Sequence, residues 1–180
     1  MAALFVLYYF LERRIYMNVR KFILLSLLVA IGFVLSPILR VPGMAPMQHF
    51  INVVTAVLLG PSYAFLGAIA ISVLRMMLLG VNILALTGSV FGAVLAGLIY
   101  RRTTKVWGAV IGEIIGTGII GAIVSFYAVS FLYGSKEVAL FTFVPSFILG
   151  TLIGTTVAYV FLEKLLSSDM LENINKQLER

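Results

Sequence analysis

Long apolar stretches follow one another along this chain from residue 22 onward, separated by short polar or turn-forming segments. The stretches that carry no formal charge cover residues 22–39, 41–74, 76–100, 114–135 and 138–162. A membrane hydrocarbon core about 30 Å thick is crossed by roughly 20 apolar residues in a helix. So much apolar sequence predicts several membrane-spanning helices rather than the core of one water-soluble domain.

The turn-forming residues divide these stretches into six predicted crossings. Two prolines and a glycine lie within residues 40–46, Gly60-Pro61-Ser62 follows the short second crossing, and residues 80–82 end the third. The predicted fold is therefore an all-α, polytopic six-helix bundle. Its crossings are residues 22–39, 47–59, 63–79, 83–100, 107–133 and 139–165.

Lysines and arginines near the ends of the crossings predict the orientation, because cytoplasmic loops carry an excess of them. Clusters lie within residues 13–21, 101–105 and 164–180, and six crossings put all three on one side. Only Arg40 and Lys136 then lie on the other side. Five or seven crossings would place one cluster outside, so we expect a cell-membrane protein with both termini in the cytoplasm.

Composition agrees with a membrane protein. Hydrophobic residues make up 62% of the chain and charged residues 11%, whereas soluble proteins carry about 25% charged residues. The net charge of +6 sits at the ends of apolar stretches and not along a helix face, which disfavours nucleic-acid binding. With no cysteine and a single histidine, the sequence offers no disulfide, thiolate or histidine-cluster metal site.

The membrane domain is predicted to cover residues 17–166, with an amphipathic cytoplasmic tail at 167–180. Residues 1–16 form an extension in which an apolar segment too short to span is followed, not preceded, by basic residues, unlike a signal peptide. We expect the functional chain to begin near Met17, residues 1–16 being a consequence of an upstream start codon. N-terminal sequencing of the native protein tests this.

The sequence is poor in groups that carry catalysis. It has no GxxxxGK[ST] phosphate loop, no HExxH metal motif and no GxSxG nucleophile motif. Glu113 is the only acidic residue between residues 22 and 136. We therefore predict no enzymatic activity, no catalytic residue and no metal site. Transport by such a chain would need an ion gradient or an external motor.

Two charged residues lie at membrane depth, where a charge costs about 2.5–3.5 kcal/mol on insertion scales and indicates a function. Arg75, in the outer part of the third crossing, either extends outward to the interface or serves a bound ligand or loop. Glu113, in the inner part of the fifth, is predicted to be a structural or partner-coupling group. Their heights differ by about 10 Å, so a direct ion pair needs both side chains extended.

Polar and aromatic residues gather at the outer level of several crossings, as expected of a pocket with aromatic walls and a few polar groups. His49, with Gln48 and Asn52, lies at the outer mouth of the second crossing, either lining a cavity for a small polar heterocycle or facing water. The predicted substrate-binding residues are Gln48, His49, Asn52, Arg75, Asn82, Thr87, Ser89, Ser125, Tyr127, Phe143 and Ser146.

Small residues recur at four-residue spacing, for example Gly108, Gly112 and Gly116. Such stripes let helix backbones approach closely in lipid, so they predict packing within the bundle. Ser26 and Ala30 on the first crossing are the alternative case, a stripe that faces a partner protein.

Several strings together resemble one known family. They are GMAPMQHFINVVTAVLLGPSY at residues 43–63, LALTGSVFGAVLAGLIYRR at 84–102 and GEIIGTGIIGA at 112–122, with Arg75 and residues 145–147. The chain resembles the substrate-capture subunits, or S components, of energy-coupling factor (ECF) vitamin transporters, and within them the thiazole-precursor group called ThiW. The resemblance covers residues 17–166, and the combination of HxxN, LLGP, GSxFGA and GExxGTG is specific.

The resemblance implies a six-helix S component that binds hydroxyethylthiazole, a thiamin precursor, under a lid formed by residues 40–46. It also implies docking on a transmembrane coupling protein and two ATPase subunits, which use ATP while this chain binds no cofactor. Ser26 and Ala30 match the spacing of the stripe that contacts the coupling protein.

Two questions stay open at this point. An autonomous secondary transporter with Glu113 as proton carrier is the alternative function, whereas an intramembrane enzyme is disfavoured by the lack of paired acids and nucleophiles. The charge of Arg75 allows two kinds of ligand. Either the ligand is a neutral thiazole and Arg75 orients the lid, or the ligand is a phosphorylated thiazole.

Overall fold

The computed structural model of the protein describes most of the chain. The described residues are 19–38, 45–134, 139–168, 174 and 178. The predictions for residues 1–16, for residues 40–44 of the predicted lid, and for Lys136 lie outside this part.

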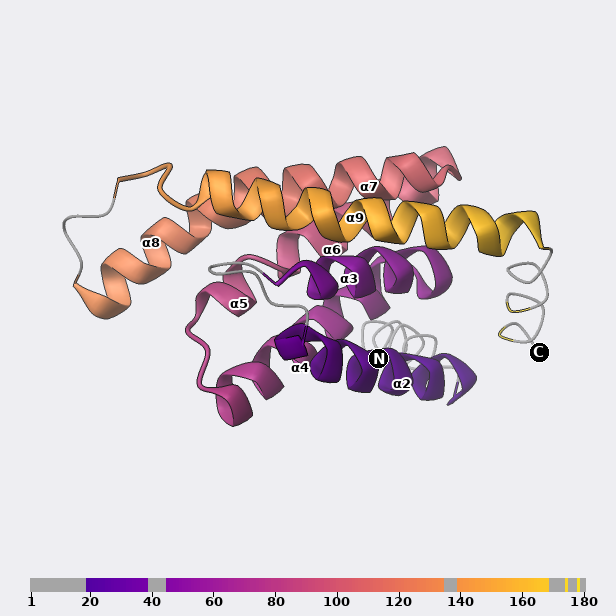
Figure 1. The fold of residues 1–180 in the computed structure, drawn as a ribbon, viewed down its shortest axis with the longest axis horizontal. Coiled ribbons are helices and arrows are strands. Elements are labelled where there is room, and N and C mark those ends of the chain that lie inside the picture. Colours follow the sequence, from indigo (N-terminus) through magenta and orange to yellow (C-terminus); the bar gives the residue numbers. More distant parts are fainter. Residues whose placement is uncertain (1–18, 39–44, 135–138, 169–173, 175–177, 179–180) are drawn as a thin grey trace, which may run out of the picture.

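Helices make up the described part, and no strand occurs within it (Figure 1). An all-α fold is thereby confirmed. In chain order the elements are α2 (Val19–Ile38), α3 (Pro46–Leu59), α4 (Pro61–Leu79), α5 (Leu84–Thr87), α6 (Val90–Thr103), α7 (Val106–Ile115), the π-helical segment η1 (Gly116–Gly121), α8 (Ala122–Tyr133) and α9 (Val144–Ser167).

Five described helical segments are long and apolar enough to cross a membrane, so the chain is a multi-pass membrane protein. The remaining predicted crossing, the second, is α3, which has 14 residues and a length of about 21 Å. It lies inside the bundle (Figure 1). The five long segments are Val19–Ile38, Pro61–Leu79, Leu84–Thr103, Val106–Leu132 and Val144–Ser167.

Some predicted crossings are less regular than the apolar pattern suggested. The fourth is divided at Gly88 and Ser89 into the short α5 and the longer α6, and the fifth contains the π-helical segment η1. The sixth was expected from residue 139, but α9 begins at Val144 because Pro145 favours the first turn of a helix.

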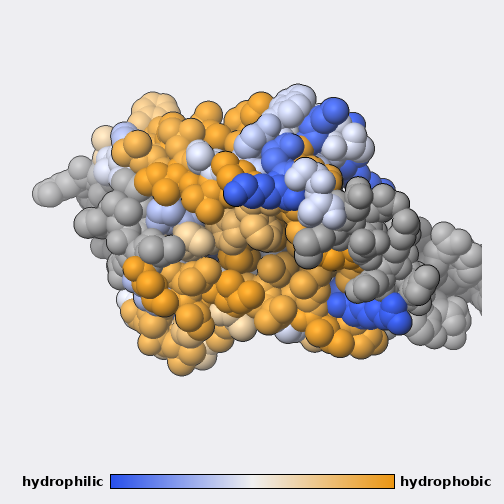
Figure 2. Space-filling view, turned by 45° about the vertical axis from the view of Figure 1, so that its right-hand side comes forward, coloured by the Kyte–Doolittle hydropathy of each residue, from blue (hydrophilic) through white to orange (hydrophobic). Residues whose placement is uncertain are grey.

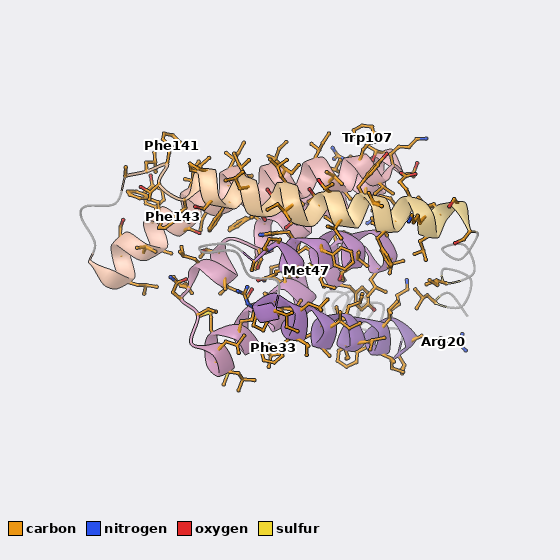
Figure 3. All side chains as sticks on the ribbon, in the orientation of Figure 1. Arg20, Phe33, Met47, Trp107, Phe141 and Phe143 are labelled. Carbon is orange, nitrogen blue, oxygen red and sulfur yellow. The ribbon has the colours of Figure 1, made fainter. Side chains whose placement is uncertain are left out.

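Apart from Arg75, the basic residues in the described part of the chain lie at one end of the bundle. Figure 3 labels Arg20 and Trp107 at this end, and Phe141 and Phe143 at the other. Arg101 and Arg102 in the last turn of α6 and Lys164 in the last turn of α9 belong to the same end. We call it the basic end. The grouping agrees with the six-crossing arrangement inferred from charge.

The central helix α3 is buried along nearly its whole length, with contacts to α2, α4, α6, α7 and α9. The surrounding helices expose large apolar side chains outward, among them Ile23, Leu152 and Phe161. Figure 2 shows a broad hydrophobic surface interrupted by a few hydrophilic residues. This surface suits lipid. From the tail, Ile174 and Leu178 pack against the core.

Glycines bring α6 and the α7–η1 segment into backbone contact. A Cβ atom added at Gly112 would lie 2.6 Å from the carbonyl oxygen of Leu95 and 2.7 Å from the Cα atom of Ala96. One added at Gly116 would lie 2.6 Å from the Cα atom of Gly92. The predicted small-residue packing is confirmed at these positions, since only glycine permits so close an approach.

Gly112→Ala is expected to lower the free energy of unfolding by about 1–3 kcal/mol, because the new methyl group meets backbone atoms that cannot move aside. Gly67→Ala is the matched control, because its Cβ would meet the flexible end of Leu25 at 3.1 Å. Thermal unfolding in detergent measures both variants. Equal stability of the two would contradict the packing described here.

Candidate ligand-binding cavity

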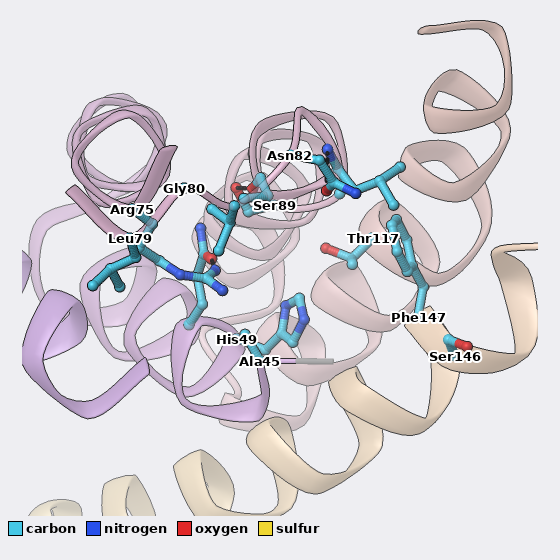
Figure 4. A pocket seen from close by; sticks show the side chains of 15 residues that line it. Ala45, His49, Arg75, Leu79, Gly80, Asn82, Ser89, Thr117, Ser146 and Phe147 are labelled. Atoms are coloured by element: carbon cyan, nitrogen blue, oxygen red, sulfur yellow. Dashed lines mark hydrogen bonds between the residues drawn. The ribbon is translucent and has the colours of Figure 1, made fainter. Parts of the chain in front are cut away.

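A cavity of about 320 Å³ lies at the end of the bundle opposite the basic end. The first turn of α3, the last turns of α4 and its loop, α5, η1 and the first turn of α9 form its walls (Figure 4). The lining residues are Ala45, Gln48, His49, Arg75, Leu79, Gly80, Val81, Asn82, Leu84, Ala85, Gly88, Ser89, Thr117, Ser146 and Phe147.

Local backbone features create this space. Pro46, in the first turn of α3, starts that helix within the bundle, so the volume beyond its N-terminus is not filled by helix. Gly80 ends α4 in the left-handed conformation with a φ of 62°, which turns the chain across the cavity mouth. Asn82 stabilises that turn because its side-chain oxygen accepts a hydrogen bond from the backbone N–H of Leu84, at 3.3 Å.

The first polar network of the cavity is built around Arg75. This side chain is only 6% exposed, and its guanidinium group donates a hydrogen bond to the side-chain oxygen of Gln48. Gln48 in turn donates to the Ser72 hydroxyl at 2.8 Å, and Ser72 donates to the carbonyl oxygen of Ala85 at 2.7 Å. Arg75 thus lies in the cavity wall and does not extend outward to the interface, which was the other reading of its charge.

The second network converges on the fully buried Glu113. Its Oε1 atom accepts hydrogen bonds from Nδ2 of Asn52 at 3.0 Å and from the Thr117 hydroxyl at 3.2 Å, and it lies 2.8 Å from Nδ1 of His49. Asn52 also donates to the carbonyl oxygen of Ser89 at 3.2 Å. Glu113 therefore joins the central helix α3 to α7 and η1, directly behind the cavity.

Sequence reasoning treated Glu113 and His49 separately and missed their contact. The HxxN spacing places His49 and Asn52 on one helix face, and Thr117 is four residues after Glu113. Those two spacings were the sequence features that pointed toward a shared polar cluster. What they could not supply was the rotation of α3 relative to α7, which depends on packing.

Six of the eleven predicted substrate-binding residues line the cavity, while Thr117 and Phe147 line it without having been predicted. Contact with a ligand remains a prediction for all of them. The six residues at the wall are Gln48, His49, Arg75, Asn82, Ser89 and Ser146.

The other five predicted residues lie away from the cavity wall. Asn52 supports Glu113, as described above, and Thr87 and Ser125 hydrogen-bond to each other at 2.6 Å between α5 and α8. Phe143 packs against Phe147 with ring centroids 6.1 Å apart. Tyr127 is 61% exposed on the outer surface of α8.

The two predicted docking residues, Ser26 and Ala30, are both exposed on α2. The opposite face of this helix buries Leu25 and Leu28 in the core. A small-residue surface is therefore open toward the membrane, although its partner stays a prediction.

The cavity offers hydrogen-bond donors, acceptors and the apolar surface of Phe147. Among the described residues, no group of three or more His, Cys, Asp or Glu side chains that could hold a metal is found. Such a wall can hold a small molecule that combines an apolar ring with a few polar atoms.

Comparison with known proteins assigns most of the chain to a family. The family described as "Thiamine-precursor transporter protein (ThiW)" matches residues 22–168, which confirms the resemblance seen in the motifs. No curated protein and no solved structure matches the chain.

Proposed function

The chain belongs to the ThiW family of thiamine-precursor transporter proteins, and on this basis we propose that it is the S component of an ECF transporter that imports hydroxyethylthiazole. The observation that carries the proposal is the cavity between Arg75 and His49, at the end of the bundle opposite the basic end. Its volume of about 320 Å³ is at the small end of the range for ligand sites. It suits one small heterocycle.

The cavity chemistry supports a neutral thiazole with a hydroxyethyl arm. Phe147 supplies an apolar ring face for the thiazole, and Arg75 supplies N–H donors for its nitrogen or hydroxyl oxygen. The Glu113 side chain lies directly behind His49, 2.8 Å from the ring. A phosphorylated thiazole would add two negative charges to a site that already holds this carboxyl group.

Energy for uptake is supplied, in this proposal, by partners. The sequence has no nucleotide-binding motif, so ATP is hydrolysed by two ATPase subunits that act through a transmembrane coupling protein. The exposed Ser26 and Ala30 on α2 support docking of that coupling protein, because small side chains let helices approach closely in lipid. The chain itself binds no cofactor.

The proposed orientation places the basic end in the cytoplasm, together with both termini. Arg20, Lys105 directly before α7 and Lys164 in the last turn of α9 support it through the excess of positive charge in cytoplasmic loops. The cavity then opens toward the outside, where substrate is captured.

The purified protein should bind hydroxyethylthiazole saturably at sub-micromolar concentration, and bind thiamin, riboflavin and the phosphorylated thiazole more weakly. Isothermal titration calorimetry in detergent measures this, with Arg75→Ala expected to weaken thiazole binding. A flat response to hydroxyethylthiazole would remove the proposed substrate. Tighter binding of the phosphorylated form would replace it with an anionic one.

Ala30→Phe is expected to abolish uptake of labelled hydroxyethylthiazole by cells while leaving its binding unchanged. The phenyl ring would block the proposed docking surface, which is remote from the cavity. Thr156→Phe, at an exposed site on α9, is the matched control and should transport normally. Uptake should also require the ATPase subunits. Uptake that persists without them and collapses with an uncoupler would favour the secondary transporter instead.

Single cysteine substitutions test the orientation cleanly, because the chain has no cysteine of its own. A membrane-impermeant maleimide should label Asn82→Cys in intact cells, and Lys105→Cys only after the membrane is permeabilised. Both residues are exposed, at opposite ends of the bundle. The reverse pattern would place the basic end outside and refute the proposed orientation.

A further inference from the structure

His49 is the only histidine in the sequence, and its two ring nitrogens have different surroundings. Nδ1 lies 2.8 Å from Oε1 of Glu113. The ring lies in the cavity wall, and Figure 4 shows it between the side chains of Arg75 and Thr117. Within the described residues only Nδ1 has a hydrogen-bond partner, so Nε2 is the nitrogen left for a ligand.

The neighbours of Glu113 indicate where protons reside. The amide nitrogen of Asn52 must face the carbonyl oxygen of Ser89, which can only accept, and this fixes the amide as a donor to Oε1 of Glu113. Thr117 donates to the same oxygen. An oxygen that already accepts from two donors is an unfavourable place for a proton.

The second carboxyl oxygen of Glu113 is the other atom on which a proton could reside. Oε2 of Glu113 is buried and has no hydrogen-bond partner among the described residues, so a proton on it would have no acceptor. The donors at Oε1 favour the carboxylate form of Glu113, with the hydrogen atom shared with His49 on Nδ1 of the ring.

The cost of buried charge bears on the protonation of Nε2. Arg75 carries one positive charge in the cavity wall, and the Glu113 carboxylate carries one negative charge behind it. A neutral His49 adds no further positive charge to the wall that holds Arg75, at membrane depth where each buried charge is costly. The neutral ring with a proton on Nδ1 has a free lone pair on Nε2.

We propose that Glu113 is a positioning residue that holds His49 with its proton on Nδ1, so that Nε2 accepts a hydrogen bond from the hydroxyl group of the ligand. Arg75, on the other side of the cavity, supplies donors for the ligand's acceptor atoms. The site thereby selects neutral heterocycles that carry a hydroxyl group over analogues that lack one. This deepens the proposed function and rests on it for the identity of the ligand.

Nitrogen NMR of protein labelled with ¹⁵N-histidine reads the ring directly, because all signal comes from His49. Without ligand we expect a protonated Nδ1 and an unprotonated Nε2. Adding hydroxyethylthiazole should shift the Nε2 resonance, while 5-ethyl-4-methylthiazole, which lacks the hydroxyl, should leave it nearly unchanged. A ring protonated on Nε2, alone or together with Nδ1, would overturn the proposal.

Affinities of the two thiazoles test selectivity. The wild type should prefer hydroxyethylthiazole by about tenfold, the worth of one good hydrogen bond. His49→Phe and Glu113→Leu should bring this ratio close to one. Glu113→Gln should retain much of it, because the amide oxygen still accepts from Nδ1.

Thr55→Val is the matched control on α3, because the buried Thr55 hydroxyl donates to the carbonyl oxygen of Ile51 in its own helix and has no other hydrogen-bond partner among the described residues. Its selectivity ratio should equal that of the wild type. An unchanged ratio in Glu113→Leu would refute the positioning role. If the wild type binds neither thiazole, the proposed ligand is wrong, and the nitrogen spectrum of the unliganded protein still decides the ring state.

Discussion

The Glu113 carboxylate lies fully buried in a membrane-spanning segment, and such a charge is stable only with hydrogen-bond donors around it. His49, Asn52 and Thr117 supply those donors. Because two of them belong to α3, the requirement fixes the rotation of this central helix against α7 and η1. The same contacts direct His49 toward the cavity and connect Asn52 to the backbone at Ser89. One buried charge thus positions much of the cavity wall.

The rest of the architecture makes room for this arrangement. Glycines at 112 and 116 let α6 approach α7 and η1 closely, and the short α3 leaves volume beyond its N-terminus. The outer faces of the remaining helices are apolar and suit lipid. In the proposed function two separate regions have separate roles. The cavity at one end binds a thiazole, and α2 presents a small-residue surface to a coupling partner. Hydrolysis of ATP takes place in other subunits.

Much of the fold was predictable from the sequence, because the length of an apolar stretch is a local property that the membrane thickness limits directly. The break at Gly88 and the π-helical η1 were not predictable, since both depend on contacts between helices. The same distinction applies to the cavity. Gln48 and His49 stand out because polar side chains are costly in an apolar helix, whereas the outward direction of Tyr127 is set by how α8 packs. The contact between His49 and Glu113 joins residues 64 positions apart and was missed for that reason.

The central claim is that a small neutral thiazole occupies the cavity between Arg75 and His49. An experimental structure of the protein with hydroxyethylthiazole bound tests it most directly. The account predicts ligand density in this cavity, with the hydroxyl group within hydrogen-bonding distance of Nε2 of His49. Density for the ligand at the basic end or on the lipid-facing surface, with this cavity filled only by solvent, would contradict it.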